Sequence, residues 1–329
     1  MRELLDVIDL EQAILITAPP GWGKTYKLLS AIKATNRNLV FIFPLRALCD
    51  EVYISALEQN IRTINLRQSS DRCQITKGNF QLVLATPETY GDFEKRENYI
   101  HVLDEFHLFY YWGETFRAKM LECYHDIFSS SLALICLTAT LMQTQKEKLV
   151  SELELNYKDI YQLDFGNQSL RNYPSAVYYY PRVFKNWLWD DLYFSPKRGT
   201  SLIFCQYRNQ VAQVEKLLNY YGYNVLACVG GGAEIFMRKL QQIKKLDYIV
   251  ATSVVSHGVN LPNISHIYFL YMVENLDFYL QMLGRGGRTG HSFEVHVMNK
   301  NYFSKKLIIK GIWKVFLKRF SNKLYSLLY

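Results

Sequence analysis

The sequence predicts an α/β protein of two similar lobes, because short apolar runs alternate with amphipathic segments in two successive series. The first series contains the expected buried strands 13–17, 39–44, 82–86, 99–103 and 133–137. The second contains the expected strands 201–205, 224–229, 248–252, 266–271 and 292–298. A polar segment with a glycine and a proline, residues 166–174, lies between the series and is the expected linker. We therefore expect two tandem domains, each a mostly parallel sheet flanked by helices.

Composition favours a globular protein that forms cores, since 49% of residues are hydrophobic and 21% are charged. No apolar run approaches the roughly 20 residues that a membrane-spanning helix needs. The first residues, MRELLDVIDLEQ, lack the basic start and apolar middle of a signal peptide. A cytoplasmic, intracellular location is therefore expected.

Cysteine and histidine spacing predicts no metal centre. The six cysteines occur singly, with no CxxC pair and no histidine at zinc spacing, so we expect reduced thiols. Core or surface roles are likewise expected for histidines 101, 125, 257, 266, 291 and 296.

The net charge of +8 is concentrated at the end of the sequence. Residues 301–329 hold six lysines, one arginine and no acid, so seven of the eight net charges lie there. Lys306, Lys310, Lys314 and Lys318 recur every four residues, which would align them on one stripe of a basic amphipathic helix. Such a helix could grip nucleic acid, dock on the second lobe, lie on an anionic membrane or bind a partner protein.

A phosphate-binding loop follows the first expected strand. Residues 18–25 read APPGWGKT and precede the helical stretch YKLLSAIK, which is the strand–loop–helix context of a P-loop. Backbone N–H groups and the helix N-terminus favour a phosphate anion there. Lys24 is expected to reach the β- and γ-phosphates, and Thr25 to hold Mg²⁺. The expected nucleotide contacts are Pro20, Gly21, Trp22, Gly23, Lys24, Thr25 and Tyr26.

By itself the P-loop leaves kinases and transport ATPases open. The side chain of Trp22 could cover the base or ribose of a nucleotide, or pack beneath the loop.

An acidic pair, Asp104 and Glu105, ends the expected strand 99–103. This is where a carboxylate that orders Mg²⁺ and one that activates water belong. Asp104 is expected to hold the metal through water and Glu105 to polarise the attacking water.

Residues 281–288, QMLGRGGR, place glycines between two arginines. The planar guanidinium stays charged and matches phosphate oxygens, so Arg285 and Arg288 are candidate arginine fingers. A flexible basic turn or a glycine–arginine patch for RNA is the alternative for this segment alone.

Together these segments resemble superfamily 2 helicases of the DExH class. In order along the chain, the segments similar to the helicase motifs are APPGWGKT, PLRALCDE, ATPETY, DEFH, TAT, SLIFCQYR, ATSVVSHGVNLP and QMLGRGGR. PLRAL, GVNLP and QMLGR are especially similar to Ski2-like helicases, including the archaeal Hel308 group. The resemblance covers nearly 275 residues.

The resemblance implies two RecA-like domains, residues 1–168 and 169–300, followed by the basic tail 301–329. ATP with Mg²⁺ would be hydrolysed in the cleft between the domains, with Arg285 and Arg288 reaching across. The expected partner is DNA or RNA as a single-stranded track, used by a monomeric motor; a protein could supply accessory domains. So small a motor would also suit an archaeon, a virus or a mobile element.

The resemblance also assigns further residues. Gln281 would join the catalytic set, and Gly258 and Asn260 the nucleotide contacts. The nucleic-acid track would comprise Arg46, Thr86, Pro87, Gln206 and Thr252. Coupling of the ATP cleft to the track would fall to His107, Thr138 and Thr140.

The sequence is compatible with two classes of function. The first is a nucleic-acid-stimulated ATPase that acts as a helicase or translocase. The second is a nucleic-acid clamp or adaptor with weak ATPase activity that needs a partner to act.

Overall fold

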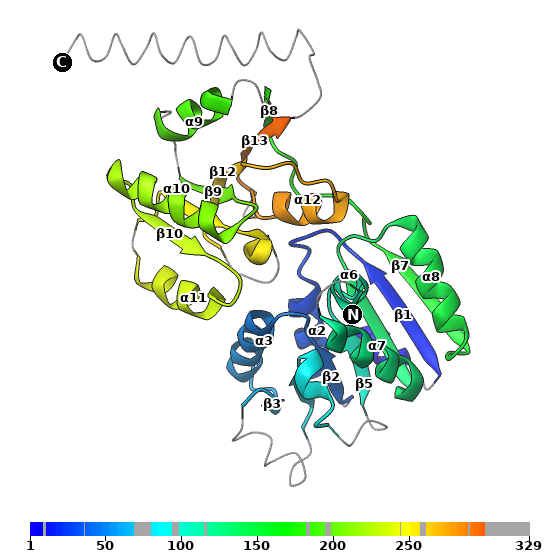
Figure 1. Ribbon diagram of the computed structural model, residues 1–329. Coiled ribbons are helices and arrows are strands. Elements are labelled where there is room, and N and C mark those ends of the chain that lie inside the picture. The colour runs from blue at the N-terminus through cyan, green and yellow to red at the C-terminus, as the bar shows by residue number, and fades with distance from the viewer. Residues whose placement is uncertain are drawn as a thin grey trace, which may run out of the picture. The chain divides into compact units, whose positions relative to one another are not determined.

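The computed structural model describes residues 1–8, 11–35, 37–68, 80–93, 99–114, 117–181, 185–194, 199–243, 245–256, 261–288 and 290–299. The chain separates into two compact units, Met1–Arg171 and Asn172–Tyr329. Each unit has its own sheet (Figure 1). The division falls inside the polar segment 166–174; the domain bounds 168/169 and 300/301 stay predictions.

The first unit is built on a parallel sheet with the strand order β3-β4-β2-β5-β6-β1-β7. Its strands are β1 (Gln12–Thr17), β2 (Leu39–Ile42), β3 (Thr63–Asn65), β4 (Leu82–Ala85), β5 (Ile100–Leu103), β6 (Ala133–Thr138) and β7 (Asp159–Asp164). Its helices are α1 (Arg2–Val7), α2 (Lys24–Lys33), α3 (Arg46–Glu58), α5 (Pro87–Tyr90), α6 (His107–Gly113), α7 (Ala118–Ser130) and α8 (Gln143–Glu154).

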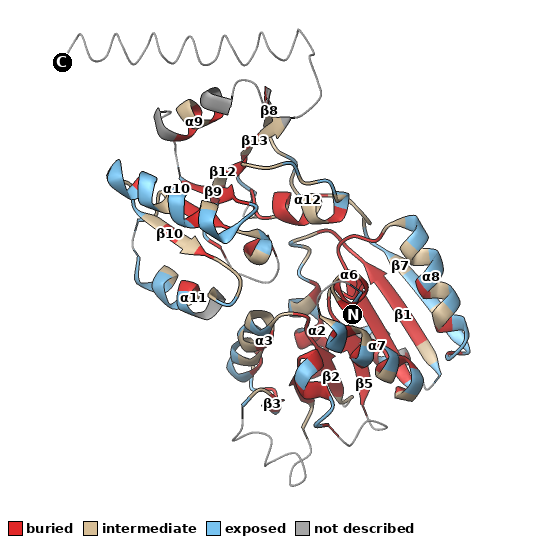
Figure 2. Cartoon of the chain, viewed as in Figure 1, coloured by how far each residue is buried: buried red, intermediate tan, exposed pale blue. Residues whose placement is uncertain are grey.

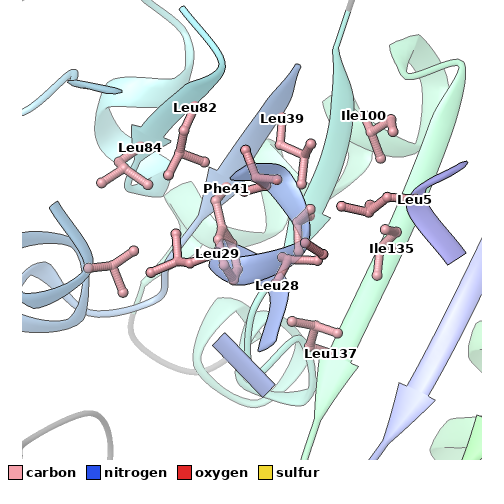
Figure 3. Close-up of a cluster of buried hydrophobic side chains, with 14 of the residues drawn as sticks. Leu5, Leu28, Leu29, Leu39, Phe41, Leu82, Leu84, Ile100, Ile135 and Leu137 are labelled. Carbon is pink, nitrogen blue, oxygen red and sulfur yellow. The ribbon is translucent and has the colours of Figure 1, made fainter. Parts of the chain in front are cut away.

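Both faces of this sheet are covered, because consecutive residues of its central strands are all buried (Figure 2). On one face, Leu28 and Leu29 of α2 pack among Phe41 of β2 and Leu137 of β6 (Figure 3). Burying a side chain of this size contributes about 1.5–3 kcal/mol. This packing fixes the start of α2 against the carboxyl ends of the strands.

The second unit has a parallel sheet with the order β10-β11-β9-β12-β13-β8. Its strands are β8 (Ala176–Pro181), β9 (Thr200–Phe204), β10 (Val225–Cys228), β11 (Tyr248–Ala251), β12 (Ile264–Phe269) and β13 (Glu294–Asn299). Its helices are α9 (Lys185–Phe194), α10 (Arg208–Tyr220), α11 (Ala233–Gln242) and α12 (Leu276–Leu283), with a 3-10 turn at Ser253–Ser256. Side chains of α9 and α10 pack with Tyr180, Ile203, Val250 and Tyr268 in the core on one face.

The ten expected strands are present, which confirms the predicted fold of two parallel α/β domains. Three further strands, β3, β7 and β8, were not expected. β7 is an edge strand with no buried residue, so its sequence DIYQLD has no apolar run to detect. β8 is also an edge strand, and β3 has only three residues.

Five cysteines, at positions 49, 123, 136, 205 and 228, are buried free thiols. No helix in the described part of the chain combines the length and the hydropathy that a membrane span requires.

Candidate active site

The loop between β1 and α2 has the backbone of an anion-binding turn. Gly21 has φ 77° and Gly23 has φ 84°, left-handed values that favour glycine. α2 begins directly after Gly23, and the first N–H groups of a helix have no intrahelical partner. Phosphate oxygens can accept from these groups at the positive end of the helix. Pro20 is half-buried here, Thr25 is the second residue of α2 and the Tyr26 side chain is exposed.

Lys24, the first residue of α2, is buried. Its Nζ donates to the carbonyl oxygen of Ala18 at 3.0 Å. That single neutral acceptor is a weak partner for a cation, so a phosphate would replace it favourably.

Asp104, at the end of β5, is only 3% exposed. Burial, followed by the negative charge of Glu105, raises the pKa of Asp104 to about 7, although the charge of Lys24 opposes this. Its Oδ1 is buried and accepts no hydrogen bond from the described residues. A buried carboxylate oxygen of this kind, close to the charge of Lys24, fits a ligand sphere for Mg²⁺ at bound phosphates.

Glu105 adopts an unusual backbone conformation, with φ 45°. Left-handed backbone in a non-glycine residue costs on the order of 1–3 kcal/mol, and such residues cluster at active sites. Its Oε2 lies 3.6 Å from Nδ1 of His107. The strained turn therefore directs a carboxylate next to the buried one of Asp104.

His107, Thr138 and Thr140, the predicted coupling residues, form one buried network. The Thr138 hydroxyl donates to the carbonyl oxygen of Thr140 at 2.8 Å, and lies 2.7 Å from Nδ1 of His107. Because that hydroxyl has only one hydrogen, Nδ1 of His107 must be the donor in the second contact. The end of β6 is thus joined to the turn that carries Glu105.

Two predicted track segments of the first unit are held together by Arg117, which the sequence did not single out. Its Nε and Nη2 donate to Glu88 at 2.8 and 2.9 Å, and its Nη1 donates to the carbonyl oxygen of Pro44. Burial alone raises the pKa of Glu88, but hydrogen bonds from Arg117 and its charge outweigh this and lower the pKa. The segments 44–51 and 85–90 are therefore fastened side by side.

The predicted contacts in these segments differ in exposure. Arg46, the first residue of α3, is exposed, whereas Thr86 and Pro87 are buried and form the start of α5. Arg67 donates to the carbonyl oxygen of Arg46 at 3.1 Å and also pairs with Asp50. Thr86 and Pro87 therefore shape the turn, and Arg46 offers its side chain to a ligand.

Trp22 packs beside the phosphate loop. Its ring stacks on Phe165, just beyond β7, with centroids 4.8 Å apart, and the Nζ of Lys27 lies 4.5 Å from its ring centre. Arg171 donates to the carbonyl oxygen of Gly21 at 2.9 Å. Neither Phe165 nor Arg171 stands in a recognisable sequence pattern, so only the fold brings them to the loop.

In the second unit, Gln206 and Thr252 follow neighbouring strands. Gln206 comes shortly after β9 and is exposed, and Thr252 comes directly after β11 and is half-buried. Since carboxyl ends of parallel strands share one edge of a sheet, both residues lie at that edge. Gly258 and Asn260 lie outside the described residues.

The segment 281–288 shows two different environments for its arginines. Arg285 is 5% exposed and donates to the carbonyl oxygen of Ser256 at 2.6 Å. Arg288 is half-buried, and its Nε donates to the carbonyl oxygen of Gly284 at 3.3 Å. Gln281 is buried in α12. Arg285 thus fastens the segment 251–256, while Arg288 is closer to solvent.

Family models match most of the chain. Residues 2–148 match the DEAD/DEAH box helicase model, and residues 185–290 match the helicase conserved C-terminal domain.

Curated relatives are helicases. The ATP-dependent helicase SGS1 of Saccharomyces cerevisiae is 24% identical over 313 residues, which are 84% of this chain and 21% of that protein. The ATP-dependent RNA helicase DBP3 of the same yeast is 32% identical over 107 residues, which are 31% of this chain and 20% of that protein. The chain spans about a fifth of the length of these relatives. Both come from yeast, so they give no support to an archaeal, viral or mobile-element origin.

Solved helicase structures share the fold. Mss116p bound to single-stranded RNA and AMP-PNP has a TM-score of 0.69 at 16% identity, covering 91% of this chain and 68% of that one. The helicase Lhr of Mycobacterium smegmatis, bound to single-stranded DNA and AMP-PNP, has a TM-score of 0.62 at 18% identity, covering 88% and 44%. These likenesses confirm the expected pair of RecA-like domains.

Proposed function

Because this chain belongs to the superfamily 2 helicases, we propose that it is an ATP-dependent motor that moves on, or remodels, DNA or RNA. One observation carries the proposal. In the first unit, Lys24, the buried Asp104 and the strained Glu105 lie at the carboxyl ends of β1 and β5, next to the network of His107 and Thr138. A protein that only binds nucleic acid has no need for a buried carboxylate beside a phosphate loop.

The residues of this site divide the work of hydrolysis among them. The first turn of α2 and Lys24 hold the nucleotide phosphates, which displaces the carbonyl of Ala18 from Lys24. Thr25 and Asp104 are proposed to hold Mg²⁺, which neutralises phosphate charge when bound. Glu105 accepts a proton from the attacking water, and its position depends on the left-handed turn.

We assign Arg288 as the cation that stabilises charge on the transferring phosphate, with Gln281 beside it in sequence. Arg285 is proposed to act as a positioning residue, because it is buried against the backbone of Ser256. Adenine is the proposed base, and the nearby Trp22 and Phe165 are aromatic surfaces at the loop.

The track is proposed to use Arg46 of the first unit with Gln206 and Thr252 of the second. Contacts of this kind go mostly to phosphate and sugar, so binding is expected to be independent of base sequence. The proposed subtype is DExH and Ski2-like, on the strength of Asp104-Glu105-Phe106-His107 and of the segments PLRAL and QMLGR. A single-stranded track and a monomeric motor belong to the same proposal, as does a partner protein that supplies accessory domains.

A phosphate-release assay tests the proposal and selects the polymer. The purified chain is incubated with ATP and Mg²⁺ alone, with single-stranded DNA, or with single-stranded RNA, and Glu105→Gln serves as the blank. We expect release that at least one polymer stimulates and that Glu105→Gln abolishes. Release equal to that of Glu105→Gln under all three conditions would favour the clamp or adaptor instead.

A further inference from the structure

A second group of polar side chains lies in the second unit, away from the residues assigned above. It comprises His266 on β12 and Glu294 and His296 on β13, with one ligand atom from each lying within 4.8 Å of the others. We propose that this histidine–glutamate–histidine cluster is a zinc site. The proposal goes beyond the motor function and does not depend on it.

Strand pairing places the three side chains on one face of the sheet. β12 and β13 are parallel neighbours in which His266 pairs with Glu294 and Tyr268 pairs with His296. Because side chains alternate along a strand, residues 266 and 268 share a face, as do 294 and 296. This is the face that α9 and α10 cover, since Tyr268 packs there with Leu188 and Leu192.

The distances suit one small cation. Glu294 Oε2 lies 3.7 Å from Nδ1 of His266 and 3.9 Å from Nε2 of His296. Ligands at about 2.0–2.2 Å from a tetrahedral zinc ion are roughly 3.3–3.6 Å apart. Small rotations of the two more exposed side chains would therefore close the site.

The surrounding residues orient these ligands as outer partners of a metal site do. Nδ1 of His296 lies 3.3 Å from the carboxylate of Asp191, which is 4% exposed, and 3.1 Å from the hydroxyl of Tyr180. Tyr268 donates to the same Asp191 carboxylate at 2.8 Å, which holds it in place. A carboxylate beside one ring nitrogen favours the proton there and leaves the lone pair on the other. For His296 that other nitrogen is Nε2, the one facing Glu294.

The hydroxyl of Tyr178 orients the carboxylate of Glu294. Tyr178 donates to Glu294 Oε1 at 3.3 Å, so the two carboxylate oxygens have different neighbours. Oε1 is held by the tyrosine, while Oε2 is the oxygen near both histidines.

The donor set and charge select the metal. Two imidazoles and one carboxylate suit zinc better than the all-oxygen spheres of Mg²⁺ or Ca²⁺. The charge of Zn²⁺ would be balanced by Glu294 and Asp191. Since the side chains of His266 and Glu294 are 18% and 32% exposed and that of His296 only 1%, the site is reached from the side of the first two. A water molecule can complete the coordination there.

Such an ion would fasten β12 to β13 and, through Asp191, both strands to α9. It would also stabilise the start of β13 next to the segment 281–288. Phe293, which precedes Glu294, packs so closely on Gly286 that a Cβ at Gly286 would meet its ring at 2.3 Å. The role we infer is therefore structural support for the segment that carries Arg288.

Zinc content and thermal unfolding test the site directly. The full chain is stripped with a chelator, loaded with one equivalent of zinc, desalted and measured by mass spectrometry of its metals. We expect about one zinc per chain, lost in His266→Ala and in Glu294→Gln and kept in the control His125→Ala, an exposed histidine of α7. These partly exposed ligands are chosen because His296→Ala, at a fully buried position, could disturb folding by itself.

Zinc at a hundredfold above its Kd should also raise the Tm of the wild type by at least roughly 4 °C. The same addition should leave the Tm of His266→Ala unchanged. Visible absorption bands of bound Co²⁺, absent in Glu294→Gln, would support direct ligation. Zinc content that neither ligand variant lowers, or a wild-type Tm that zinc does not move, would overturn the assignment. Neither result would bear on the phosphate site, because Lys24 belongs to the first unit and the three ligands belong to the second. Lys24→Ala is accordingly expected to keep the zinc.

Discussion

At the end of β5 the carboxyl group of Asp104 has its pKa raised to about 7, first by burial and then by the charge of Glu105. The folded pKa lies above the unfolded value of 3.8, so the contribution of this group to stability is present below about pH 4. It is lost as the pH rises through 7. A carboxyl group that is buried although burial disfavours its charged form indicates a role in function.

Asp104→Asn is therefore expected to stabilise the nucleotide-free protein more at pH 8 than at pH 5. Each pKa unit corresponds to about 1.4 kcal/mol, and about two units separate pH 5 from the folded pKa, so the difference between the two pH values should be roughly 3 kcal/mol. Thermal unfolding in a chelator at both pH values measures it, and an equal change in Tm at both would contradict the buried carboxylate. The same variant should lose ATP hydrolysis.

Lys24 and Glu105 are expected to fail at different steps. Lys24→Ala should lose nucleotide binding, because Lys24 holds the phosphates, whereas Glu105→Gln should bind nucleotide and not hydrolyse it. Fluorescent-nucleotide binding and phosphate release distinguish the two. Lys33→Ala, an exposed lysine in the last turn of the same helix, is the matched control and should keep both activities. Normal turnover in either Lys24→Ala or Glu105→Gln would show that the substituted residue has no role in the mechanism.

Substitution of the two arginines of the segment 281–288 should also have two different effects. Arg288→Ala is expected to slow hydrolysis at least a hundredfold, with nucleic-acid affinity in the absence of nucleotide unchanged. Arg285→Ala should instead lower stability by about 1–3 kcal/mol, because it leaves the buried carbonyl of Ser256 without this donor. Steady-state kinetics and thermal unfolding of both variants give the comparison. A large loss of hydrolysis rate in Arg285→Ala, at unchanged Tm, would show instead that Arg285 is a second arginine finger.

Among the elements, α7 is joined to two loops through its preceding residue, Arg117. Its contacts with Glu88 and with the backbone at Pro44 hold the loops before α3 and at α5. We expect Arg117→Ala to weaken binding of single-stranded nucleic acid by several-fold to tenfold, because the loop that precedes Arg46 is released. Nucleotide affinity should change little.

Fluorescence anisotropy with a labelled oligonucleotide measures this effect. Lys119→Ala in the same helix is the control, since its ion pair with Glu122 is exposed and contributes little. If Arg117→Ala binds the oligonucleotide as tightly as Lys119→Ala does, the contacts of Arg117 with Glu88 and Pro44 do not contribute to nucleic-acid binding.

Elements with an apolar run or a glycine-rich turn could be predicted from the sequence, and the others could not. β1 and the turn at Gly21 and Gly23 are specified by residues adjacent in the chain. Arg117 and Arg171 act through backbone carbonyls far away in sequence, and a carbonyl leaves no mark in the sequence. The left-handed φ of Glu105 likewise leaves no mark in the sequence, because glutamate is not a residue type that favours this conformation.

At the scale of the whole molecule, two parallel sheets follow from the doubled strand–helix pattern, while strand order depends on crossovers that the pattern does not encode. The grouping of His266 with Glu294 and His296 could not be predicted from the sequence pattern either. These residues are distant along the chain and become neighbours only when β12 pairs with β13.

The distribution of charge over the whole chain leads to the final prediction. Seven of the eight net positive charges lie in residues 301–329, outside the described residues, so residues 1–300 are almost neutral overall. A nearly neutral motor body attracts a polyanion weakly, and we therefore expect the tail to supply much of the binding that is independent of base sequence. Each lysine that neutralises a phosphate adds about 0.9 to the salt slope on duplex and about 0.7 on single strands.

Deleting residues 301–329 should weaken binding equally for all base sequences and flatten the plot of log K against log salt. Nucleotide binding should persist, because Lys24 and Asp104 belong to the first unit. The control replaces Lys306, Lys310, Lys314 and Lys318 with glutamine, which keeps the length and apolar residues of the tail. If the folded deletion variant keeps the wild-type slope, the tail has another role, such as docking on the second unit. If only the deletion lowers the slope, and the glutamine variant does not, the stripe of lysines is not the contact.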